Sequence, residues 1–108
     1  MKKIEAVIFP VHLNAVRMEL ERRGIRGGFT LVEVRYTDSD KWLLPTERGG
    51  SEKFQGRVKL ELIVEDSEVD KAVNVILRHA QPQSDAEGGQ IAVLEVDEIL
   101  RIGPPQAE

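Results

Sequence analysis

Residues 57–81 decide the fold of this chain, and they read RVKLELIVEDSEVDKAVNVILRHAQ. In the first part, apolar and charged residues alternate, which predicts a half-buried strand. The apolar face of this strand consists of Val58, Leu60, Leu62 and Val64. From about Ser67 the spacing changes to a helical period, which predicts a helix that packs on a core. Its apolar stripe consists of Val69, Ala72, Val73, Ile76 and Leu77.

The same succession of strand and helix occurs near the N-terminal end of the sequence. Residues 3–9 are rich in Ile, Val and Phe and predict a strand. Pro10 ends this strand because proline has no N–H to donate to a neighbouring strand. A helix is predicted over 12–23, with Gly24 as its C-terminal stop. The apolar face of this helix consists of Leu13, Val16 and Leu20.

Two further strands complete the pattern. Residues 30–36 alternate, with Val32, Val34 and Tyr36 on one face, and residues 90–97 predict the last strand. The order β-α-β-β-α-β predicts an α+β, ferredoxin-like domain, in which two helices cover one face of a four-stranded antiparallel sheet. The other face of such a sheet also needs cover.

We expect a single domain over residues 1–103, followed by a disordered tail over 104–108. Symmetric self-association is the simplest cover for Tyr36 and for the apolar faces of the strands at 30–36 and 58–64.

Two segments match no strand or helix. The segment 38–56 joins two strands and far exceeds an ordinary hairpin loop of about 2–5 residues, which indicates a functional loop. Its strongest apolar cluster contains Trp42, a residue type enriched where proteins bind partners. Trp42 either anchors a partner or folds back on its own assembly. The second such segment is 82–89.

Composition excludes several classes of protein. The net charge of −4 over 108 residues, and strands without a row of aromatic residues, do not fit nucleic acid binding. The absence of cysteine excludes a disulfide framework and a thiol nucleophile, and we expect a cytoplasmic location. His12 and His79 are not spaced as ligands of one metal, and no nucleophile and base are recognisable by spacing. We therefore expect neither a metal site nor an enzyme.

Three segments resemble the PII signalling family. Residues 1–27, MKKIEAVIFPVHLNAVRMELERRGIRG, are similar to the family's lysine-led strand, proline and helix that ends in G-I-x-G. Thr30 matches the threonine that follows in the family, after one extra residue. Residues 57–81 are similar to the family's third strand and second helix. Residues 88–102, GGQIAVLEVDEILRI, are similar to its last strand and the arginine just beyond it.

The resemblance implies a homotrimer that binds adenine nucleotides between neighbouring subunits. It also implies that the loop at 38–56 docks on a target, such as a transporter or a metabolic enzyme, and it implies no cofactor. The positions that match the family's nucleotide contacts are Gly27, Thr30, Ile63, Gly88, Gly89, Gln90 and Arg101.

Departures from the family pattern bear on the choice of nucleotide. The family has a glycine-rich stretch with an arginine before the long loop, whereas residues 36–40 read YTDSD here. Gln90 stands where the family's second loop has a lysine, and Gly103 replaces the second arginine of the final R-x-R pair. Fewer cationic contacts weaken the hold on the outer phosphates. We expect ADP or AMP to bind at least as well as ATP.

PII-like proteins associated with carboxysomes and bicarbonate transport diverge from the family in a broadly similar way. We therefore expect bicarbonate at the base of the long loop. The residues expected to hold it are Thr37, Asp38, Ser39 and Arg57. The alternative functions are a conventional nitrogen regulator with degenerate loops and a ferredoxin-like amino-acid-binding domain.

Several of these residues also have an ordinary structural interpretation. Gly88 and Gly89 can form a plain turn, Arg101 a surface ion pair, and Arg57 a solvated strand end.

Overall fold

The computed structural model describes residues 1–36, 55–82 and 89–105, with the side chain of Gln55 excepted. Four strands and two α-helices follow one another in the predicted order. They are β1 (Lys2–Ile8), α1 (Leu13–Arg22), β2 (Thr30–Tyr36), β3 (Gln55–Val64), α2 (Val69–His79) and β4 (Gln90–Glu95). Single 3₁₀ turns, η1 (Pro10–His12) and η3 (Asp66–Glu68), precede the two helices.

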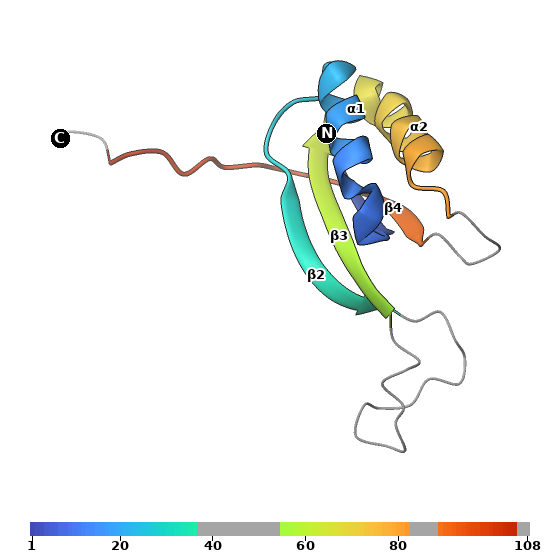
Figure 1. Ribbon diagram of the computed structural model, residues 1–108. Helices are drawn as coiled ribbons and strands as arrows, with labels where there is room; N and C mark the ends of the chain where they lie inside the picture. The colour runs from blue at the N-terminus through green and yellow to red at the C-terminus, as the bar shows by residue number, and fades with distance from the viewer. Residues whose placement is uncertain (37–54, 83–88, 106–108) are drawn as a thin grey trace, which may run out of the picture.

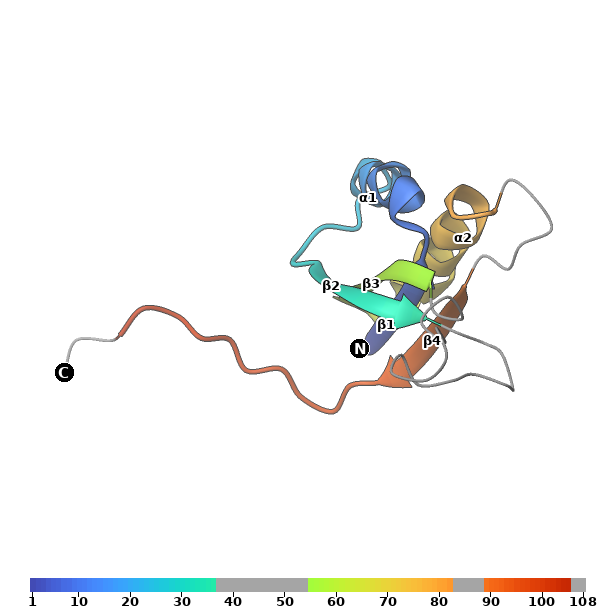
Figure 2. The same cartoon turned by 60° about the horizontal axis from the view of Figure 1, so that its bottom comes forward.

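The described strands form one antiparallel sheet with the order β2-β3-β1-β4 (Figure 1). Both helices lie on the same face of this sheet, side by side (Figures 1 and 2). The predicted ferredoxin-like arrangement is confirmed. Because β1 and β3 are central, β2 and β4 form the two edges.

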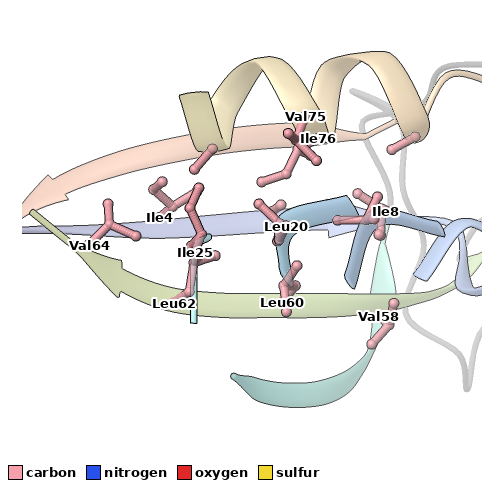
Figure 3. Packing of buried hydrophobic residues seen from close by; sticks show 14 residues of the cluster. Ile4, Ile8, Leu20, Ile25, Val58, Leu60, Leu62, Val64, Val75 and Ile76 are labelled. Carbon is pink, nitrogen blue, oxygen red and sulfur yellow. The ribbon is translucent and has the colours of Figure 1, made fainter. Parts of the chain in front are cut away.

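The core lies between the helices and the two central strands (Figure 3). Ile4 pairs with Leu62 and Ala6 with Leu60, so their side chains share the face that the helices cover. The largest fully buried side chains are Ile4, Leu20, Leu60, Ile76 and Val16. Burying each Leu or Ile stabilises the fold by about 1.5–3 kcal/mol before entropy is counted.

The predicted apolar stripe of α2 wrongly includes Leu77 and leaves out Val75. Leu77 is 55% exposed, whereas Val75 is 3% exposed and packs in the core. The 3₁₀ turn η3 occupies the position where the helix was expected to begin, and α2 itself starts at Val69. The buried set of α2 is therefore Ala72, Val75 and Ile76.

Strand ends also differ from the prediction by a few residues. β1 covers residues 2–8 rather than 3–9, and β4 ends at Glu95 rather than at residue 97. β3 begins at Gln55, within the segment assigned to the long loop, because β2 continues to pair with it up to Tyr36.

The sheet face opposite the helices is only partly apolar. The apolar face of β3 points to the helices, so the expectation that it needs a separate cover is wrong. The open face of the central strands instead carries ion pairs, with Lys3 Nζ 3.0 Å from Glu5 and Lys59 Nζ 3.1 Å from Glu61. The large apolar residues exposed on this open face are Val32, Ile63 and Leu94. Self-association would therefore have to cover these residues.

Beyond Glu95 the chain leaves the sheet as an extended arm (Figure 2). Leu100 and Ile102 in this arm are 80% and 101% exposed. The last three residues of the expected tail, 106–108, lie outside the described residues.

Candidate functional site

Four of the residues expected to contact a nucleotide line one hollow of about 390 Å³. They are Gly27, Thr30, Ile63 and Arg101. The segment between α1 and β2, the start of β2, the end of β3 and the C-terminal arm bring them together from three separate parts of the sequence. We call this hollow the arm-side site.

Local backbone geometry explains the glycine in the arm-side site. Gly27 has φ +135°, a conformation that side chains with a Cβ rarely adopt. The turn that follows leads into β2, where Thr30 pairs with Glu61 of β3. Ile63 comes two residues later on the same face of β3 and is 42% exposed, which offers an apolar surface beside the polar groups.

The arm-side site is also lined by charged residues that the sequence analysis did not assign to it. They are Lys3, Arg26, Glu61 and Glu65. Arg26 stands between Ile25 and Gly27 in the G-I-x-G motif, and that adjacency was the available signal. Lys3 became recognisable only from the pairing of β1 with β3.

The charge of Lys3 is maintained by its neighbours. The hydrogen-bonded ion pair with Glu5 raises the pKa of Lys3, and the nearby Glu61 raises it further. The same ion pair lowers the pKa of Glu5. The arm-side site therefore combines the basic side chains of Lys3, Arg26 and Arg101 with the carboxylates of Glu61 and Glu65.

The other described nucleotide-contact candidates lie at the opposite end of the sheet. Gly89 and Gln90 stand at the start of β4, where Gln90 pairs with Val7 of β1. Gly89 has φ +119°, and a Cβ added there would lie 1.8 Å from the carbonyl oxygen of Val7. Only glycine fits this close approach. An adjoining hollow of about 410 Å³, lined by α2 and β4, includes both residues. We call this end the turn-side site.

Arg57 also belongs to the turn-side site, and it is buried. Its side chain is 4% exposed, so the interpretation as a solvated strand end is wrong. The guanidinium carbon lies 3.7 Å from the centroid of the Phe9 ring and 5.0 Å from that of Tyr36. Each cation–π contact of this kind contributes about 0.5–2 kcal/mol. Two aromatic rings thus help to keep a cation inside the protein.

The two sites are separate within one copy of the chain. Arg57 and Ile63 lie six residues apart on β3, which corresponds to about 20 Å at ~3.3 Å per residue. One small anion cannot contact both ends. Thr37, Asp38, Ser39, Trp42 and Gly88, which were also expected to bind ligand or partner, lie outside the described residues.

Two negative findings apply to residues 1–36, 55–82 and 89–105. These residues contain no cluster of three His, Cys, Asp or Glu side chains placed to hold a metal ion. None of their helices has the length and hydropathy needed to span a membrane.

The fold and the two sites define an α+β, ferredoxin-like domain with positive-φ glycines and basic side chains at both ends of its sheet. The family model of the nitrogen regulatory protein P-II matches residues 1–105. The chain belongs to the P-II family of nitrogen regulatory proteins.

Individual relatives agree with this assignment. The chain is 38% identical over 104 residues to the nitrogen regulatory protein P-II of Pasteurella multocida, covering 94% of this chain and 91% of that protein. It is 32% identical over 111 residues to the P-II protein of Pyropia yezoensis, with the same coverage of both chains. Among solved structures, the PII protein of Arabidopsis thaliana bound to citrate matches with a TM-score of 0.72 and 30% identity. That match covers 94% of this chain and 81% of the Arabidopsis chain.

Proposed function

We propose that this protein binds an adenine nucleotide, with ADP or AMP favoured over ATP, in a site shared between subunits of a homotrimer. The observation that carries the proposal is the position of the candidate contacts at two opposite ends of the sheet. Gly27, Thr30, Ile63 and Arg101 line the arm-side site, whereas Gly89 and Gln90 belong to the turn-side site. A second copy whose turn-side site meets the arm-side site of the first would complete the set.

The preference for nucleotides with fewer phosphates follows from charge. Gln90 is neutral and exposed at the turn-side site. Gly103 in the arm adds no cation beside Arg101. A charge-assisted hydrogen bond to phosphate contributes about 1.5–3 kcal/mol, so the loss of such bonds weakens the hold on a third phosphate.

The test is calorimetry of AMP, ADP and ATP with the full-length protein, together with light scattering to measure its mass. We expect ADP or AMP to bind at least as tightly as ATP, and a mass of three chains. Arg101→Gln should weaken ADP binding by tenfold or more. Arg78→Gln, an exposed arginine on α2, is the matched control and should change nothing. A tenfold preference for ATP, or a stable monomer, would contradict the proposal.

We propose further that nucleotide binding controls a protein target through the segment 38–56, with Trp42 as an anchor. The target would be a membrane transporter or an enzyme of carbon metabolism. Deletion of 42–44 should abolish capture of that target and leave ADP affinity unchanged. Loss of target capture together with loss of ADP binding would instead indicate a general effect on the trimer.

Bicarbonate is the proposed effector, and its candidate contact is Arg57 together with the backbone of Thr37, Asp38 and Ser39. The guanidinium carbon of Arg57 lies over two aromatic rings, and its planar array of N–H donors suits a small planar anion. The citrate of the Arabidopsis structure indicates that a related PII protein binds a carboxylate anion. Titration of ADP with and without bicarbonate at fixed pH tests this. An unchanged ADP affinity would contradict it.

A second candidate function is a conventional nitrogen regulator, which the names of the curated relatives favour. Such a regulator would bind ATP with magnesium and 2-oxoglutarate. Titration of 2-oxoglutarate in the presence of ATP and magnesium, compared with bicarbonate in the presence of ADP, separates the two functions.

A further inference from the structure

Arg57 is the point where three separate stretches of the chain meet. Phe9 follows β1, Tyr36 is the last residue of β2, and Gly89 directly precedes β4. The guanidinium carbon of Arg57 lies 3.7 Å and 5.0 Å from the two aromatic ring centroids. A Cβ built on Gly89 would stand 3.4 Å from Nη1 of Arg57, so Gly89 lies beside this side chain.

The neighbours of Arg57 leave little freedom for independent movement. Gly89 lies so near the backbone of Val7 that a Cβ there would stand 1.8 Å from the Val7 carbonyl oxygen, and Arg57 is 4% exposed. A guanidinium held over two rings cannot shift without changing the distance to at least one of them. A displacement of Gly89 toward Arg57 therefore moves the cation relative to Phe9, Tyr36 or both.

We propose that Arg57 is a positioning residue that couples the turn at Gly89 to the end of β2 at Tyr36. The coupling concerns nucleotide binding only through the proposed function, since Gly89 is one of the candidate nucleotide contacts. If the proposed function holds, a ligand bound at the turn-side site changes the environment of Tyr36. The long segment toward β3 begins directly after this residue. The coupling itself exists in the protein without ligand.

The composition of the chain provides a clean probe. Tyr36 is the only tyrosine among 108 residues, so protein labelled with ¹³C in the tyrosine ring gives signals from this residue alone. The chain has nine glycines, so ¹⁵N-glycine labelling gives a spectrum simple enough to assign Gly89.

The first experiment is a double-mutant cycle on the Tyr36 ring resonance of the intact protein without ligand. Gly89→Ala introduces a Cβ that must displace the turn, and we expect it to shift the Tyr36 signal. In the Arg57→Lys background, which keeps the charge and removes the planar stack, the shift should fall to less than a third. In the Arg35→Lys background it should be unchanged, because Arg35 is an exposed arginine beside Tyr36 on the other face of β2. Equal shifts in all three backgrounds would overturn the proposal.

The reciprocal experiment does not depend on the folding of Gly89→Ala. Tyr36→Leu removes one ring from the stack at the end of an edge strand, and we expect it to shift the amide resonance of Gly89. This shift should be lost in the Arg57→Lys background and kept with Arg35→Lys. A Gly89 shift that persists without Arg57 would also overturn the proposal.

Addition of ADP to the labelled protein separates this coupling from the proposed function. If calorimetry shows that ADP binds, the Tyr36 shift on binding should require Arg57. An ADP-induced shift of the same size in Arg57→Lys would overturn the role of Arg57 in signalling. If ADP does not bind, the proposed function fails, and the ligand-free cycle still decides whether Arg57 couples the two segments.

Discussion

Gly89 lies so close to Val7 that a Cβ at position 89 would stand 1.8 Å from the Val7 carbonyl oxygen. Glycine at this position is thus required by the packing of β4 against β1, in addition to any contact with a ligand. The same residue has φ +119°. Two independent physical reasons exclude a larger side chain here.

Gly89→Ala should therefore destabilise the protein by more than about 1 kcal/mol, because both the backbone conformation and the contact with Val7 are unfavourable for alanine. Gly56→Ala is the control, since nothing lies within 4 Å of a Cβ at that position and φ is not positive. Urea unfolding at fixed protein concentration measures the stability of both variants. Equal stability of the two variants would show that the close approach is not maintained in solution.

Leu60 and Leu77 provide a comparison of two leucines that sequence reasoning placed equally in the core. Leu60 is 1% exposed and Leu77 is 55% exposed. Leu60→Ala should reduce the free energy of unfolding by about 2–5 kcal/mol. Leu77→Ala should change it by less than about 0.5 kcal/mol unless a partner or second copy covers that helix face. If a second copy covers Leu77, the loss of stability in Leu77→Ala depends on protein concentration. Measuring its free energy of unfolding at two protein concentrations tests this.

The ion pair between Lys3 and Glu5 predicts a specific pH dependence. Its hydrogen bond lowers the pKa of Glu5 below the ordinary value of 4.5. A lowered folded-state pKa means that the stabilising contribution of Glu5 is present above pH 4.5 and is lost as the pH falls through the folded-state value. Thermal unfolding of wild type and Glu5→Gln should thus differ at neutral pH and converge in acid.

The contribution of Lys3 to stability depends on pH in the opposite direction. Its pKa is raised above 10.5, so its contribution is complete below pH 10.5 and is lost as the pH rises through the folded-state value. Lys3→Gln should therefore match wild type only in strong alkali. Glu33→Gln, a substitution of an exposed carboxylate on β2, is the control for nonspecific charge effects. If the Glu5→Gln difference persisted unchanged in acid, the ion pair would not be its cause.

The shared nucleotide site predicts complementation between two defective variants. Arg101→Gln damages the arm-side site, and Gln90→Glu places a negative charge at the turn-side site. Each variant alone should bind ADP weakly. After the two are refolded together in equal amounts, about a quarter of the sites in random trimers combine an intact Gln90 with an intact Arg101. Calorimetry should then detect ADP binding at wild-type affinity in about that fraction of the sites. Recovery of none would place both residues in the same subunit's site.

The amino-acid sequence alone determined the order of strands and helices. Alternation over 58–64 and helical spacing after it are local properties, and the structure confirms both elements. The sequence also predicted, from the match to a family pattern, a nucleotide site that includes Gly27, Thr30, Ile63 and Arg101. These four residues line one hollow, and their contact with a nucleotide stays a prediction.

Only the tertiary structure decided which environment each side chain has. From the sequence, Arg57 allowed two interpretations, an anion contact or a solvated strand end; in the structure it is buried against Phe9 and Tyr36, which are distant in the chain. The apolar face of β3 was visible in the sequence, but that the helices cover it follows from its register with β1. Periodicity along one segment reports which residues share a face. The contacts of that face depend on pairing between segments that are far apart in the chain, and no local pattern contains this information.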